Sequence, residues 1–95
     1  MIIQSKAFRL RHPVDCQGIF CVDPAGLLEI DLVPQQRQLM APFEQLIFVP
    51  HCGGTRVQRQ GQHAWQVELE DQDAGRLIRM IRNAQDELET LMREL

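Results

Sequence analysis

The sequence of 95 residues predicts an α+β fold: an antiparallel sheet or open small barrel of five to seven strands, followed by one long C-terminal helix. Up to residue 70, short runs of alternating apolar and polar residues are separated by Pro and Gly turns, which is typical of strands. From residue 71 onward proline is absent and apolar residues recur every three or four positions, as in a helix. We therefore expect one domain over 1–95, with a β-rich region over 1–70 and a helix over 71–95.

The first three strands are predicted by alternation and by one turn. Residues 6–11 alternate apolar residues with basic ones, and Pro13 ends this run because proline cannot donate to a sheet. Residues 17–32 are predicted to form a β-hairpin. Its turn is Asp23-Pro24-Ala25-Gly26, which has the residues that a type I turn favours at the first, second and fourth positions.

Four shorter strands are predicted after this hairpin, over residues 38–41, 46–49, 55–59 and 64–69. Pro42 limits the first of them to a sheet edge or a bulge. The second is continuously apolar, which predicts a strand buried on both faces. In the third, we expect Val57 to face inward and both Arg56 and Arg59 to face outward. Each run is followed by residues that favour turns or by the predicted helix.

The predicted helix has an apolar stripe along its whole length. The stripe consists of Ala74, Leu77, Ile81, Ala84, Leu88, Leu91 and Leu95. Asp71 is the predicted N-cap, since aspartate accepts hydrogen bonds from the first free amides of a helix. A helix of about 24 residues is about 36 Å long, which exceeds the width of a small barrel. We therefore expect the first half to pack on the sheet and the last turns to project.

The charges of the helix indicate self-association. Arginines occupy its N-terminal half and most of the acidic residues its C-terminal half, so an antiparallel pair would place unlike charges side by side. The leading hypothesis is a non-enzymatic protein-interaction or scaffolding domain that binds a partner protein, including a second copy of itself as a homodimer. The predicted partner contacts are Leu77, Ile81, Leu88, Leu91, Leu95, Arg79 and Glu87.

An alternative function is suggested by arginines expected on exposed strand faces. Arg9, Arg11, Arg56 and Arg59 would form a basic patch if their strands were neighbours, and such a patch could bind a lipid headgroup, an acidic peptide or a nucleic acid. The formal net charge of −3 and the low aromatic content of 5% argue against a general nucleic-acid surface.

Cysteines and histidines suggest a third function, a zinc site or an enzyme. Cys16, Cys21, His51 and Cys52, with His12 or His63, include the ligand types that zinc prefers, but their spacing does not match that of structural zinc sites. Cys52 beside His51 lacks a third group that would orient a nucleophile. We therefore expect no catalytic residue, no metal and no cofactor.

The sequence also favours a cytoplasmic location. It has three cysteines, which cannot all pair within one chain, so we expect them to be reduced. It contains neither a run long enough to span a membrane nor an N-terminal pattern typical of a signal peptide.

Up to seven β segments followed by one C-terminal helix resemble the pleckstrin-homology-like superfold. The resemblance lies in the order of the elements along nearly the whole chain. It implies that a bent sheet forms an open barrel, that the helix closes one end, and that the domain binds or scaffolds other molecules. The tryptophan that the family carries in its helix is missing here, because Trp65 lies in the preceding strand. Arg9, Arg11 and His12 are nearest to the family's basic phosphoinositide signature.

Overall fold

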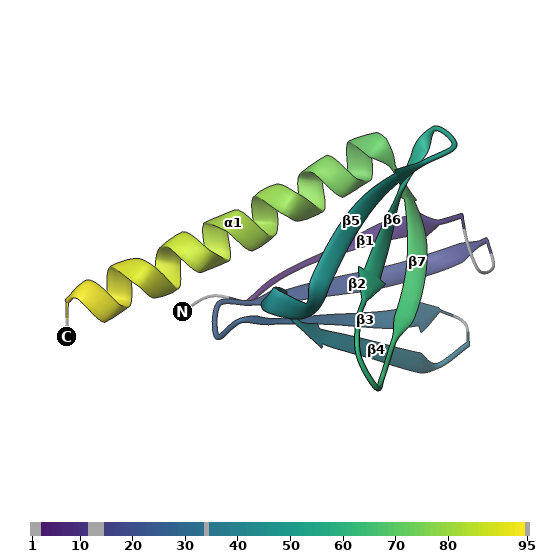
Figure 1. The fold of residues 1–95 in the computed structure, drawn as a ribbon. Coiled ribbons are helices and arrows are strands. Elements are labelled where there is room, and N and C mark those ends of the chain that lie inside the picture. The colour runs from purple at the N-terminus through teal and green to yellow at the C-terminus, as the bar shows by residue number, and fades with distance from the viewer. Residues whose placement is uncertain (1–2, 12–14, 34, 95) are drawn as a thin grey trace.

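A computed structural model describes residues 3–11, 15–33 and 35–94 of the chain (Figure 1). Within these residues the elements, in chain order, are β1 (Gln4–Leu10), β2 (Cys16–Asp23), β3 (Leu27–Val33), β4 (Arg37–Pro42), the 3-10 turn η1 (Phe43–Gln45), β5 (Leu46–His51), β6 (Gly54–Arg59), β7 (Trp65–Glu70) and α1 (Asp71–Arg93). This confirms the predicted fold class, seven strands followed by one long C-terminal helix.

The strands form two antiparallel sheets, in the orders β1-β2-β3-β4 and β5-β6-β7. The hairpin of β2 and β3 turns at the predicted tetrapeptide, where the Gly26 amide donates to the Asp23 carbonyl over 2.9 Å. The Asp23 side chain also accepts a hydrogen bond from the Ala25 amide, which holds the turn. Gly26 has a φ of 107°, a conformation that favours glycine.

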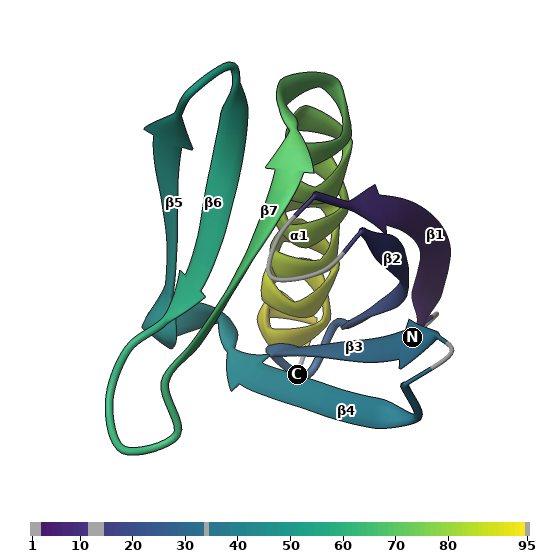
Figure 2. The ribbon, with the colours of Figure 1, turned by 90° about the vertical axis from the view of Figure 1, so that its right-hand side faces the viewer.

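The two sheets meet at two junctions but do not close into a barrel (Figure 2). At one junction, the Arg11 amide after β1 donates to the Glu68 carbonyl of β7 over 2.8 Å. At the other, the Met40 carbonyl of β4 accepts hydrogen bonds from the Trp65 indole and the Arg59 guanidinium, over 2.9 and 2.7 Å. A backbone hydrogen bond at the first junction and side-chain hydrogen bonds at the second therefore connect the sheets where strand ladders would complete a barrel.

The core lies between the two sheets and α1, and it consists of inward-facing strand residues together with the buried face of the helix. Phe8 and Phe20 meet edge to face with ring centroids 5.3 Å apart. The largest fully buried hydrophobic side chains are Leu10, Phe20, Val22, Leu28, Ile30, Val57, Val67, Leu69 and Leu77.

The strand over residues 46–49 differs from its prediction. It belongs to β5, and the side chains of Leu46 to Val49 are only partly buried. The reason is that β5 is the edge of a three-stranded sheet, so it has a neighbouring strand on one side only. A continuous apolar run alone does not distinguish such an edge strand from a strand buried on both faces.

The helix α1 packs on the sheets with its first half only (Figure 1). Its buried residues are Ala74, Leu77, Ile81 and Ala84, and beyond Ala84 none of its described residues is buried. At 1.5 Å per residue its 23 residues span about 34 Å, whereas the two shorter extents of the molecule are 27 and 26 Å. The end of the helix therefore projects beyond the strands. No helix of the described chain has both the length and the apolar character to cross a membrane.

Two predictions about the helix are wrong. Leu77 was predicted to contact a partner, but it is a core residue that is fully buried against the sheets. Ile81, also a predicted contact, is 7% exposed and lines a groove at the surface. Asp71 was predicted to be the N-cap, but it is the first helical residue; Glu70 is the N-cap and makes no side-chain cap. The Asp71 carboxylate instead accepts a hydrogen bond of 2.8 Å from the Thr55 hydroxyl of β6, which ties the start of α1 to the neighbouring strand.

Because α1 is buried only in its first half, we predict that truncation of two of its leucines changes the free energy of unfolding unequally. Leu77→Ala should lower the free energy of unfolding by about 2–5 kcal/mol, because it leaves a cavity in the core. Leu91→Ala should change it by less than about 1 kcal/mol in dilute protein, because this side chain is 38% exposed on the projecting end. Urea unfolding followed by circular dichroism measures both. Equal losses would show that the end of α1 belongs to the core.

Candidate functional site

The end of α1 is the part of the helix that the fold leaves without a covering layer. We call residues 85–94 the projecting segment. In it, Leu88 is half-buried, Leu91 is 38% exposed and Met92 is 65% exposed, so the apolar stripe continues where no strand covers it. Leu95, the last predicted contact, lies outside the described residues. Exposed apolar side chains in a row along a helix generally mark a surface that binds another helix or a groove.

A shallow apolar groove begins beside the projecting segment. It runs between α1, η1 and β5 with a volume of about 280 Å³, and its lining residues are Phe43, Leu46, Phe48, Ile78, Ile81, Arg82 and Gln85. A second hollow, lined by Gln85, Leu88, Glu89, Met92 and Arg93, continues it toward the end of the helix. Gln85 lines both, so one side of α1 presents a continuous apolar and polar surface from Ile78 to Met92.

Charges are distributed unevenly along this side of α1. Arg79 and Arg82 are exposed, and neither has an ion pair with another described residue. Closer to the end of the helix, Asp86 and Glu89 are also exposed. Glu89 and Arg93 form the ion pair expected from their spacing, with an N–O distance of 2.7 Å. Exposed pairs of this kind stabilise a helix only slightly, so Glu89 can also interact with a second cation.

The sequence did not reveal the groove itself, although it indicated the projecting helix. Phe43 and Phe48 come from the consecutive elements η1 and β5, whereas Ile78 lies far along the chain in α1, so no local spacing connects the two walls of the groove. One signal in the sequence is Ile78, an apolar residue next to Leu77 that widens the apolar stripe of α1. Glu87, a predicted contact, is half-buried.

The four arginines of the predicted anion site do not form one patch. Arg59 shares a face of β6 with the buried Val57, since residues two apart in a strand point the same way. Its guanidinium bonds to the Gln45 side chain and the Met40 carbonyl, so its predicted outward orientation is wrong. Arg56 lies on the other face of β6, and its partner in the register of β6 and β7 is Glu68.

Arg11 and Arg56 lie near a buried carboxylate on the outer face of the smaller sheet. Glu68 is only 9% exposed, and the Arg56 Nε is buried with no hydrogen-bond partner among the described residues. Gly54 has no side chain, and the Arg11 side chain occupies the space beside it. A Cβ at position 54 would lie 2.8 Å from Arg11 Nη1 and 2.8 Å from the Leu69 carbonyl oxygen. The carboxylate of Glu68 reduces the attraction of this face for an anion.

Arg9 is neutralised by a close acidic neighbour. Its guanidinium donates two hydrogen bonds to the Asp15 carboxylate, over 2.8 and 2.7 Å. These bonds raise the pKa of Arg9 and lower the pKa of Asp15, because each charged group favours the charged form of the other. Arg9 therefore contributes little net positive charge to an anion site.

The cysteines do not come together with other ligands in the described structure. Cys16 and Cys21 are half-buried on β2, whereas Cys52 is exposed in the turn between β5 and β6. No group of three or more His, Cys, Asp or Glu side chains that could hold a metal occurs among the described residues. His12, one of the candidate ligands, lies outside them. Burial, together with Asp31 and Glu29, raises the pKa of the Cys21 thiol.

Comparison with family models, with curated proteins and with solved structures found no match to this chain.

The different surroundings of the cysteines predict their order of alkylation. Iodoacetamide should modify the exposed Cys52 first and Cys21 last, because a raised pKa leaves less of the reactive thiolate at a given pH. The difference should shrink as the pH rises and the Cys21 thiol ionises. Peptide mass spectrometry at a series of times and pH values measures the rates. Alkylation of Cys21 as fast as that of Cys52 at pH 8 would contradict the described environment of β2.

Proposed function

We propose that this protein is a non-enzymatic interaction domain that self-associates through an antiparallel contact of α1 with α1 of a second copy. The observation that carries the proposal is the projecting segment, whose exposed Leu91 and Met92 continue an apolar stripe beyond Ala84, the last buried residue among the described positions of the helix. In water such a stripe favours association, since each buried square ångström of apolar surface contributes about 25 cal/mol.

The groove beside α1 suggests the register of the pair. Gln85 lies midway between Ile78 and Met92, seven residues from each. In an antiparallel pair centred on Gln85, Met92 of one copy lies opposite Ile78 of the other. Met92 then enters the groove between Phe43 and Phe48, where an unbranched side chain adapts readily to an irregular surface.

The charges on the same side of α1 fit this register. Positions 81 and 89 are equidistant from Gln85, so Glu89 of one copy lies opposite Ile81 of the other copy. Glu89 is therefore within one residue of Arg82 of that copy. Parallel pairing would instead place each acidic half beside the other acidic half. The antiparallel arrangement is therefore favoured by charge as well as by the groove.

The limited size of the surface predicts a weak dimer. The contact involves a few turns of each helix and the groove of each copy, whereas stable complexes typically bury about 1,200 Å² or more in total. We therefore expect an equilibrium between monomer and dimer that shifts with protein concentration, as suits a reversible scaffold.

The alternative function, an anion-binding module, has less support. An anion site of this kind needs the four arginines on one surface. Arg59, however, takes part in a junction between the sheets, and Arg9 is paired with Asp15. The remaining pair, Arg11 and Arg56, shares its face with the buried Glu68.

Sedimentation equilibrium of the full chain tests the proposed dimer. The wild-type chain should associate as its concentration rises, whereas a chain ending at Ala84 and a Met92→Glu variant should remain monomeric. Val33→Glu is the control, because Val33 is also an exposed apolar residue, at 43%, but lies at the end of β3, which has no part in the proposed contact. A wild-type chain that stays monomeric at about millimolar concentration, the range of the weakest specific contacts, would refute the proposal.

A charge-exchange cycle tests the antiparallel register. Arg82→Glu and Glu89→Arg should each weaken the dimer severalfold, because each places like charges together across the contact. The double variant should recover most of the loss, since it restores unlike charges in exchanged positions. Dissociation constants from sedimentation provide the comparison, with Lys6→Glu, at an exposed position of β1, as a control for a general change of net charge. Additive losses in the double variant would rule out this register.

A further inference from the structure

The strand β4 has an edge that faces a groove. β4 pairs with β3 alone in its sheet. The Met40 carbonyl points away from β3, because it accepts the hydrogen bonds from Arg59 and Trp65. In a strand the N–H and C=O of one residue point to the same side, and every second residue repeats that direction. The Met40 amide and both backbone groups of Gln38 therefore also point away from β3, toward the groove.

The groove lies between β4 and the turn that joins β6 to β7. It has a volume of about 550 Å³, and its lining includes Arg37, Gln38, Met40, Arg59, His63 and Trp65. Trp65 is half-buried and Met40 is 42% exposed, so the groove has an apolar wall. Of the described residues that line it, two are arginines, Arg37 and Arg59, and none is acidic. This basic groove contrasts with the net charge of −3 of the whole chain.

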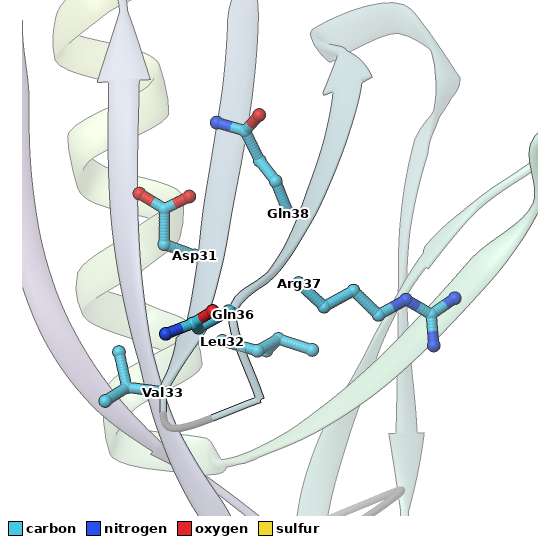
Figure 3. A pocket seen from close by; sticks show the side chains of 6 residues that line it. All are labelled: Asp31, Leu32, Val33, Gln36, Arg37 and Gln38. Carbon is cyan, nitrogen blue, oxygen red and sulfur yellow. The ribbon is translucent and has the colours of Figure 1, made fainter.

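The side chains of β4 separate to the two faces of the strand. Figure 3 shows the Gln38 side chain on the same side as Asp31, its partner in the register, whereas the Arg37 side chain extends away from both. The carboxylate of Asp31 therefore lies on the other face from the Arg37 guanidinium. Arg37 is exposed, so its charge is accessible from the groove.

From these observations we infer that the β4 edge binds an extended acidic peptide segment of a partner protein, which adds to the sheet as a further strand. The backbone groups of Gln38 and Met40 provide the hydrogen bonds of such an addition. Arg37 provides the attraction for acidic side chains. Because the Met40 carbonyl is already occupied by Arg59 and Trp65, the added strand is short and ends at Met40.

A second copy of this chain fits the edge less well than an acidic peptide. If two β4 strands paired antiparallel with Gln38 opposite Gln38, Arg37 of one copy would lie opposite Leu39 of the other. The two Arg37 side chains would then be only two positions apart. Like charges on neighbouring strands are destabilising. The inference is independent of the contact proposed for α1, which uses the helix and the groove beside it rather than the edge of β4.

Binding of a defined peptide tests the backbone part of the inference. The probe is a fluorescein-labelled eight-residue peptide of alternating Val and Glu, measured by fluorescence anisotropy with the full chain. Gln38→Pro removes one amide that faces the groove but none that bonds to β3, so an edge strand tolerates it. It should weaken binding about three- to tenfold, as expected for one lost hydrogen bond. Gln38→Ala, which removes the same side chain but keeps the amide, should weaken binding less than about twofold.

Charge variants and mapping complete the test. Arg37→Glu should weaken binding at least about fivefold, whereas Arg79→Glu on α1 should leave it unchanged. A peptide of alternating Val and Lys should not bind. In the nuclear magnetic resonance spectrum, the acidic peptide should shift the backbone amides of Gln38 and Met40. If Gln38→Pro fails to fold, Arg37→Glu and this mapping decide the question.

Several results would overturn the inference. One is the absence of binding by the Val-Glu peptide at about 1 mM, the limit of weak specific contacts. Another is equal affinity of folded Gln38→Pro and Gln38→Ala for the peptide. Amide shifts confined to α1 would place the peptide elsewhere. Self-association of the wild-type chain that Gln38→Pro abolishes would show that a second copy, not an acidic peptide, occupies the β4 edge.

Discussion

The packing of the first half of α1 against the two sheets is the interaction on which the rest of the structure depends. The sheets contact each other through few hydrogen bonds, one from the Arg11 amide and others from the Arg59 and Trp65 side chains. Such bonds contribute about 1 kcal/mol each. The apolar side chains of the helix, including the fully buried Leu77, add the larger hydrophobic contribution that holds the open sandwich together.

This interaction also leaves part of the molecule uncovered. A helix of about 34 Å cannot bury its whole stripe on a body about 27 Å across, so the stripe emerges into solvent after Ala84. The same open architecture leaves β4 with one neighbour, because side chains rather than a strand occupy the junction near Met40. The projecting segment therefore follows from a helix that is longer than the sheets beneath it. The free β4 edge follows from two sheets that do not close into a barrel.

Much of the fold could be predicted from the sequence, because local patterns determine it. Alternation identified the strands, the tetrapeptide from Asp23 to Gly26 identified the hairpin, and helical spacing placed the start of α1 at Asp71. The spacing could not show which stripe residues the sheets cover, so Leu77 and Ile81 were predicted to be partner contacts although they are buried. Arg59 was predicted to face outward because it is charged, although alternation places it on the same face as the buried Val57; there its side chain reaches the Met40 carbonyl of β4. The resemblance to the pleckstrin-homology-like superfold stays a prediction.

The central claim is that α1 beyond Ala84 serves association rather than the core of the monomer. Hydrogen–deuterium exchange of the full chain at low and high protein concentration tests it most directly, because it reports location and association together. We predict that amides of residues 86–94 exchange rapidly in dilute protein and gain protection as the concentration rises, while those of residues 77–84 stay protected throughout. Exchange in residues 86–94 that does not depend on concentration, whether fast or slow, would contradict the account.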